Sequence, residues 1–458
     1  MRLFLLIRGD IDMKRIIAFS LVFVTVFSAS AKLDPFSVYK LEAPENCVDR
    51  TLDKEQIGLT ELIQMGICTN PALNRSYMSV KSSEAEVGQA KAEYLPSVTA
   101  TGSASVSGTK YEKGTYDKRY PYSGNVGLDW LLFDFGGRSA RLEKMKAYLS
   151  SAEFNYNAQL QETILSINNA YLRLLGAKEV LSSAKDSEKS YKKAYEESKR
   201  RYDLGLVALS DKLLAKTSYE QSKLTTLKAE NTVKQAQGNL ATLLNLTPDT
   251  SFNLMTPPKD KDITKLETTE SVEKMMELAL EQRPELKSKE SGVQAAKENI
   301  SAVRSTTLPT VSASGSAGYG DVWRKSSPYQ LSTSAGVRLN VPLFTGFNDT
   351  YKVAAAEYQY RQAQYGLQET QNSIRNEVWS AYQDYQTAVE AYKISQAVLD
   401  SAKENERVAM KSYEVGKGDI LNLLTATSQM SDARQGFVNA FYSVLISKAN
   451  LYRAVGRF

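Results

Sequence analysis

The sequence lacks histidine entirely and holds only two cysteines among its 458 residues. Without imidazole, the commonest general acid–base catalyst and the commonest metal ligand are missing. No phosphate-binding glycine motif, nucleophile elbow or metal-ligand cluster takes their place. Carboxylates such as Glu196 and Glu197 fall on a predicted helix surface, where water solvates them. We therefore expect a protein that is not an enzyme and that needs no cofactor or metal.

Long apolar runs are also scarce, and the one near the N-terminus predicts export. Residues 16–27 are mostly apolar, follow a Lys-Arg pair and precede the segment SASA at 28–31. This order is typical of a secretory signal peptide, here residues 1–31, with Met13 as an alternative start. A membrane anchor is the alternative, but the run is too short to span a bilayer. Residues 32–59 are expected to be irregular.

The charges are balanced, with 57 basic and 52 acidic residues and a net charge of +5. They form no basic stripe, so we expect no nucleic-acid partner. In an exported chain, Cys47 and Cys68 are expected to form a disulfide. It would close a loop of about 22 residues and contribute roughly 3 kcal/mol. Two free buried thiols are the alternative.

Proline and glycine are nearly absent from two long stretches. Residues 138–204 contain no proline and one glycine, Gly176. At ~1.5 Å per residue, one helix over this stretch would be roughly 100 Å long. Apolar residues recur in it at steps of three and four, separated by Lys, Glu, Gln, Ser and Asn, which is typical of a coiled-coil array. Residues 348–415 have the same character.

The two long stretches belong to an internal repeat. Matching residues lie 213 positions apart before a two-residue deletion and 211 positions apart after it. The pairs are Pro71 with Pro284, Pro96 with Pro309, Gly102 with Gly315, Phe133 with Phe344, Tyr171 with Tyr382, Tyr202 with Tyr413 and Gly205 with Gly416. We predict a first repeat at 60–247, a linker at 248–270 and a second repeat at 271–458. Each repeat would contain a helix, two strands, the long helix and a return helix.

Alternating residues mark the strands, which are predicted at 97–109, 121–133, 309–321 and 330–342. In the first, Val98 and Ala100 share one face, while Thr99 and Thr101 share the other. One apolar and one small-polar face are typical of an outer-membrane barrel wall. A soluble sheet with one buried face is the alternative. Because four strands cannot enclose a lumen, several copies would have to share one barrel.

A nine-residue motif carries a resemblance to a known family. The segment WLLFDFGGR at 130–138 opens the first long helix, and the weaker VPLFTG at 341–346 precedes the second. With the repeat, it resembles the TolC family of trimeric outer-membrane efflux and secretion channels. The resemblance implies a mainly α-helical fold with a β-barrel part. In a homotrimer, four strands per chain would give a 12-stranded barrel in outer-membrane lipid above an α-helical barrel that crosses the periplasm.

The resemblance also implies a function. The chain would be the outer-membrane exit duct of a tripartite export system, for type I protein secretion, multidrug efflux or both. Its partners would be a periplasmic adaptor and an inner-membrane transporter. A secreted coiled-coil fibre or adhesin is the alternative. A fibre or adhesin would not explain why the two repeats each contain a strand pair at the same position.

The implied site lies at the periplasmic tip, where the adaptor would dock on two turns: Leu204, Gly205, Leu206, Val207, Val415, Gly416, Lys417 and Gly418. Ser210, Asp211 and Tyr413 match the hydrogen-bonded lock that closes the family's channels. Well-known members have an arginine where Gly418 stands and carboxylates where Asn422 and Thr425 stand. Asp419 is near enough to replace some of that charge. We therefore expect weak cation selectivity and weak block by divalent cations.

Overall fold

The computed structural model describes residues 57–110, 112, 114, 116–255, 271–323 and 329–457. Four predictions lie wholly or partly outside these residues and stay predictions. They are the signal peptide at 1–31, the irregular segment at 32–59, of which only the last three residues are described, the disulfide between Cys47 and Cys68, because Cys47 is outside, and the linker beyond residue 255. Within the described residues, no helix is both long enough and apolar enough to cross a membrane.

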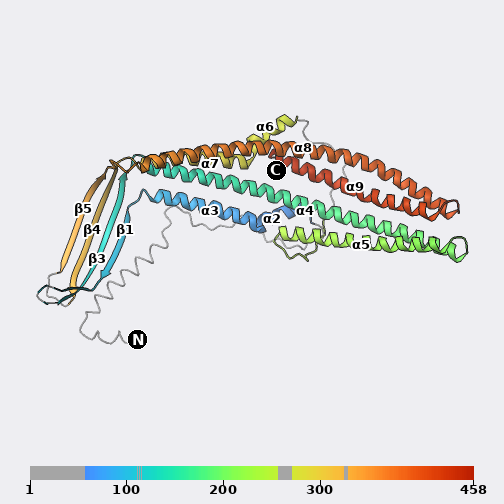
Figure 1. Cartoon of the computed structure of the whole chain (residues 1–458), viewed down its shortest axis with the longest axis horizontal. Helices are drawn as coiled ribbons and strands as arrows, with labels where there is room; N and C mark the ends of the chain where they lie inside the picture. Colours follow the sequence, from blue (N-terminus) through green and yellow to red (C-terminus); the bar gives the residue numbers. More distant parts are fainter. Residues whose placement is uncertain are drawn as a thin grey trace. The chain divides into compact units, whose positions relative to one another are not determined.

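The described chain contains the same order of elements twice (Figure 1). We name the two halves copy 1 and copy 2. Copy 1 consists of α2 (Leu59–Thr69), α3 (Pro71–Ala92), β1 (Ser97–Ala104), β2 (Ser107–Lys110), β3 (Tyr116–Phe133), α4 (Gly137–Asp203) and α5 (Leu209–Leu243). Copy 2 consists of α6 (Val272–Gln282), α7 (Pro284–Ser305), β4 (Thr310–Trp323), β5 (Gln330–Asn340), α8 (Asn348–Glu414) and α9 (Ile420–Val455). The short helices α2 and α6 were not predicted.

The two long helices have the same length, 67 residues each. Each starts after a left-handed turn, at Phe135 and Gly136 before α4 and at Gly346 and Phe347 before α8. Proline is the first residue of each of the shorter helices α3 and α7. The N–H of a first helical residue has no acceptor within the helix, so proline loses no hydrogen bond there. The proline-free stretches of the sequence therefore become single helices, as their pattern predicts.

The motif at 130–138 joins β3 to α4. Arg138 is buried, and its guanidinium donates to the carbonyls of Leu131 at 2.7 Å and Leu132 at 3.0 Å. The Asp134 carboxylate accepts from the Arg138 backbone N–H at 2.6 Å. A Cβ on Gly137 would stand 2.4 Å from the Ser305 hydroxyl of α7. The motif therefore ties the end of the strand to the first turn of the helix and lets α7 approach it.

The strands form one antiparallel sheet in the order β1–β3–β4–β5, with β2 also pairing with β3. All residues of β1 and β5 are exposed, and the apolar Val98, Leu331 and Val337 are 65, 70 and 71% exposed. A soluble sheet of this alternation buries its apolar face. In the described chain this sheet has neither face buried and two unpaired edges.

The strand limits differ from the predicted ones for a local reason. The segment predicted as one strand at 97–109 divides into β1 and β2, although both continue the same register against β3. Pro121 lies opposite the break and has no N–H, so only its carbonyl pairs, accepting from Ser105 at 3.0 Å. β3 also begins at Tyr116, five positions before the predicted 121, and β5 ends at Asn340, two positions before Pro342.

The helices pack side by side, with α4 as the central one (Figure 1). Near the sheet α4 contacts α3 and α7, and farther from it α4 contacts α5 and α9. α8 contacts α7 and α9 in the same way. The largest apolar core lies around the middle of α4, where Leu62 of α2, Ile167, Leu174 and Leu240 are fully buried. This core fixes the central part, and the helix pairs extend from it to the tip.

Candidate functional site

The tip consists of two turns that end the long helices in the same way. Gly205 and Gly416 both have φ of +77°. In the first turn, Gly205 N–H donates to the Tyr202 carbonyl and Leu206 N–H to the Arg201 carbonyl, both at 2.9 Å. The second turn repeats these bonds from Gly416 and Lys417. This is the Schellman cap, which needs a left-handed residue and so favours glycine.

The tip turns expose apolar side chains. Leu204, Leu206 and Val415 are 68, 66 and 69% exposed. An apolar side chain that no part of its own chain covers is a natural contact for a partner. The structure thus places the predicted docking residues together at one end of the protein, and their role stays a prediction.

Tyr413 packs beneath the second turn, against α4 and α9. Its side chain is 1% exposed, and the Arg201 guanidinium lies 4.8 Å from its ring centroid. Ala215, Ile420 and Leu423 are buried in the same cluster. Among the described residues, the Tyr413 hydroxyl has no hydrogen-bond partner, although it is buried. A buried hydroxyl without a partner costs free energy, so this atom would gain from an acceptor brought close to it.

Ser210 and Asp211 lie in the first turn of α5 and bond to each other. The Ser210 hydroxyl donates to the Asp211 carboxylate at 3.1 Å. Neither side chain hydrogen-bonds the Tyr413 hydroxyl in the described chain. The predicted lock is therefore not formed within the single described chain, and it stays a prediction for the assembled protein.

Asp419 caps the start of α9. Its carboxylate accepts from the Asn422 backbone N–H at 2.7 Å. Asn422 and Thr425 are exposed one turn apart, on a stripe that continues along α9 in steps of three and four. The further members of the stripe are Gln429, Asp432, Gly436, Asn439 and Ser443. Among these seven residues only Asp432 has a carboxylate, so this face of α9 is mostly uncharged.

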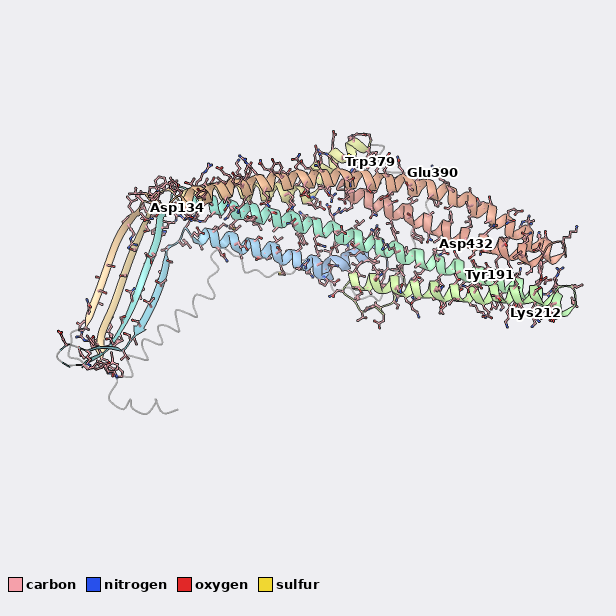
Figure 2. The ribbon with its side chains drawn as sticks, viewed as in Figure 1. Asp134, Tyr191, Lys212, Trp379, Glu390 and Asp432 are labelled. Atoms are coloured by element: carbon pink, nitrogen blue, oxygen red, sulfur yellow. The ribbon has the colours of Figure 1, made fainter. Side chains whose placement is uncertain are left out.

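Tyr191 of α4 approaches this face of α9 farther from the tip (Figure 2). Burial raises the pKa of Tyr191, and the nearby charge of Asp432 raises it further, against a hydrogen bond with Ser428. The α4–α9 contact therefore includes a half-buried phenol with Asp432 close by.

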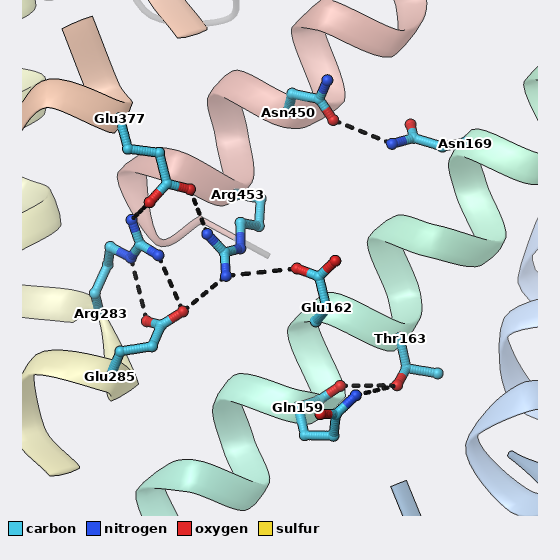
Figure 3. Close-up of polar contacts among 9 residues, drawn as sticks. All are labelled: Gln159, Glu162, Thr163, Asn169, Arg283, Glu285, Glu377, Asn450 and Arg453. Carbon is cyan, nitrogen blue, oxygen red and sulfur yellow. Dashed lines mark hydrogen bonds and ion pairs between the residues drawn. The ribbon is translucent and has the colours of Figure 1, made fainter. Parts of the chain in front are cut away.

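A charged cluster that sequence reasoning missed joins α7, α8, α9 and α4 (Figure 3). Arg283, which is 3% exposed, bonds both oxygens of Glu285 and one oxygen of Glu377. Arg453 bonds the other oxygen of Glu377, donates to Glu285 at 2.8 Å and lies 3.5 Å from Glu162. Burial alone would raise the pKa of Glu285, but the hydrogen bonds and charge of Arg283 hold that pKa below its usual value.

Copy 1 has no such cluster at the equivalent place. Asn70, Ala72, Ser166 and Thr242 stand where copy 2 has Arg283, Glu285, Glu377 and Arg453. The Asn70 side chain accepts from the N–H groups of Ala72 and Leu73 and donates to the Leu243 carbonyl at 2.9 Å. At this place copy 1 therefore has a neutral side chain that caps α3 and bonds the end of α5, and copy 2 has a charged cluster.

The chain matches a family described as outer membrane efflux protein over residues 62–246 and 275–457. Protein CyaE of Bordetella pertussis is 29% identical over 389 residues, which cover 84% of this chain and 81% of that protein. Outer membrane protein TolC of Vibrio cholerae is 26% identical over 335 residues, covering 71% and 73%. The Campylobacter jejuni CmeC outer membrane channel has a similar fold, with a TM-score of 0.74 at 19% identity and 87% and 85% coverage.

Proposed function

Because this chain belongs to the outer membrane efflux protein family, we propose that three copies of it form the exit duct of a tripartite export system. It is an outer membrane channel protein whose helical part extends into the periplasm. The observation that carries the proposed assembly is the sheet, which in a single described chain has two open edges and exposed apolar side chains. Open edges cannot stay unpaired in lipid. Four strands from each of three copies would close a 12-stranded barrel.

The helices support a head-to-tail ring. α5 and α8 lie at opposite sides of the helical layer, and each leaves one long face uncovered in the described chain. Exposed residues follow each of these faces in steps of three and four, which is the spacing of a coiled-coil seam. On α5 they are Leu213, Thr217, Glu220, Leu224 and Leu227, and on α8 they are Ala391, Ile394, Val398, Ser401, Asn405 and Val408. Two different faces that pair between copies generate a closed ring when the rotation closes.

The assembly is tested on protein purified from outer membranes in detergent. Native mass spectrometry is expected to give a trimer, and planar bilayers are expected to show discrete conductance steps. The variant Ile394→Glu with Val398→Glu places two charges on the α8 seam and is expected to shift the protein to monomers. Lys393→Glu with Gln396→Glu, exposed positions of the same helix outside that stripe, is the control. A monomeric wild type without conductance would refute the proposal.

At the tip, we propose that a periplasmic adaptor docks on the two turns and that Ser210, Asp211 and Tyr413 hold the resting channel closed. The buried Tyr413 hydroxyl, which has no partner among the described residues, supports this because the Asp211 carboxylate, in the first turn of α5, is a hydrogen-bond acceptor at the same tip. Tyr413→Phe is expected to raise the resting conductance, since it removes the donor and little volume. Tyr202→Phe, at the matching place in copy 1, should leave conductance unchanged. Equal conductance of Tyr413→Phe and wild type would argue against the lock.

A further inference from the structure

A groove of about 680 Å³ lies over α4, between α5 and α9. Small and apolar side chains line its floor: Gly176, Ala177, Val180 and Ala184 of α4, with Ala229 and Ala236 of α5. We call this feature the α4 groove. Neither the tip nor the barrel uses it.

Gly176 lies in the floor of the groove. It is the only glycine within α4 after the first residue of that helix. A Cβ at this position would stand 3.2 Å from the ring of Tyr442 on α9. Glycine therefore lets the Tyr442 ring pack directly on the α4 backbone at one side of the groove.

The groove lies on the face of α4 that the other described residues leave free. On the other face, Lys178 donates to the Phe252 carbonyl at 3.2 Å, and Tyr171 donates to the Met255 carbonyl. At about 100° per residue, Arg173 and Val180 point roughly away from these two side chains. The segment that contains Phe252 and Met255 packs on that other face, as does α2. In a closed ring of helices, this additional layer has space only on the outside. The groove then faces the interior of the channel, a step that rests on the proposed function.

The groove is cationic and otherwise uncharged. Arg173 and Lys228 line it, and none of its lining residues is acidic. Both side chains are exposed, and neither has an ion-pair partner among the residues that the structure describes. Ser, Thr, Asn and Gln supply the rest of the polar lining. Copy 2 has Asp384 and Asn439 at the equivalent positions, so the two cations belong to copy 1 alone.

We propose that the α4 groove binds acidic, extended segments of polypeptide cargo inside the channel. From Arg173 to Ala184 the floor is about 16 Å long, which accommodates about five residues of extended chain. Acidic side chains pair with Arg173 and Lys228, and small apolar side chains rest on the alanine floor. The amide and hydroxyl groups on the rim bond the backbone of the segment, which is independent of its sequence. Because Arg173 and Lys228 are the only charged residues of the lining, the groove favours acidic over basic segments. Two such cations do not hold a segment permanently.

The test uses the purified full-length protein in detergent and two labelled ten-residue peptides, one alternating Glu with Leu and one alternating Lys with Leu. Fluorescence anisotropy measures binding. The Glu peptide is expected to bind and the Lys peptide to bind at least tenfold more weakly. Arg173→Gln with Lys228→Gln should weaken the Glu peptide about tenfold, as for two exposed ion pairs. Lys193→Gln with Lys234→Gln makes the same charge change outside the groove and should leave binding unchanged.

Charge reversal keeps the test decisive if a variant folds poorly. Arg173→Glu with Lys228→Glu should reverse the preference between the two peptides, which a damaged protein cannot do. Equal binding of both peptides, no binding of either, or an unchanged affinity in the Gln variant would overturn the proposal. So would tighter binding of free dodecanoate than of the Glu peptide, because the occupant would then be a small amphiphile. If the same sample is trimeric and conducts, only the groove proposal fails. Loss of the trimer counts against the proposed function instead.

Discussion

Glu285→Gln is the sharpest test of the charged cluster. It keeps the volume of the side chain and removes the charge that faces Arg283 and Arg453. Arg283 is 3% exposed and Glu285 is 26% exposed at its side chain, so the pair is largely shielded from water. Removing one partner of a buried ion pair costs about 3–5 kcal/mol, because the other charge stays buried. Glu377 still contacts both arginines, so we expect a loss of about 2 kcal/mol.

Thermal unfolding followed by helical circular dichroism, on purified protein under identical conditions, measures the loss. Glu404→Gln removes one carboxylate from an exposed pair with Arg407 and should leave the transition unchanged. The variant Arg283→Asn with Glu285→Ala imitates Asn70 and Ala72 of copy 1. It should be more stable than Glu285→Gln alone, because it also removes the buried Arg283 charge, which in Glu285→Gln has lost one of its two carboxylate partners. If Glu285→Gln unfolds like wild type, or if the imitation is the less stable variant, the cluster contributes nothing to stability.

Three further predictions concern pH and the tip. Because Arg283 lowers the pKa of Glu285, the stability gap between wild type and Glu285→Gln should be full above about pH 5 and close as pH falls below about 4; a pH series of the same unfolding experiment checks this. Gly416→Ala should destabilise by about 1 kcal/mol and make the tip more sensitive to protease, because φ is +77° and Arg201 lies 3.0 Å from the new Cβ. Gly436→Ala, a helical glycine with open space around it, should be neutral or stabilising. Finally, Asn422→Asp with Thr425→Asp should make divalent cations block the bilayer conductance strongly, whereas the wild type should be blocked weakly. Strong block of the wild type at micromolar concentration would contradict this prediction.

The repeat made much of the fold predictable. The separation of 211 positions identified α4 and α8 as twins and placed Gly205 and Gly416 at matching turns. The earlier separation of 213 positions relates α2 to α6, which begin at Leu59 and Val272, but each of these helices spans only 11 residues. The break between β1 and β2 follows from Pro121, whose partner across the sheet is known only once the register is fixed.

The candidate site was predictable only in part. The turns depend on a few neighbouring residues, so local sequence identifies them. The charged cluster depends on Arg283, Glu285, Glu377 and Arg453, which come from three helices far apart in the chain. No short pattern reveals such a contact. The bond expected of Tyr413 is not formed in the described chain, and the sequence alone does not say where its acceptor lies.

The equal length of α4 and α8 has a consequence for symmetry. Both helices leave the same sheet and run 67 residues, so the Gly205 and Gly416 turns come to the same end of the protein (Figure 1). Each chain thus has two similarly built turns at the same end. Three copies would offer six around one axis, arranged with threefold true symmetry and sixfold approximate symmetry. A partner built from six identical subunits could then contact this end with every subunit, although the proposed channel would contain only three chains.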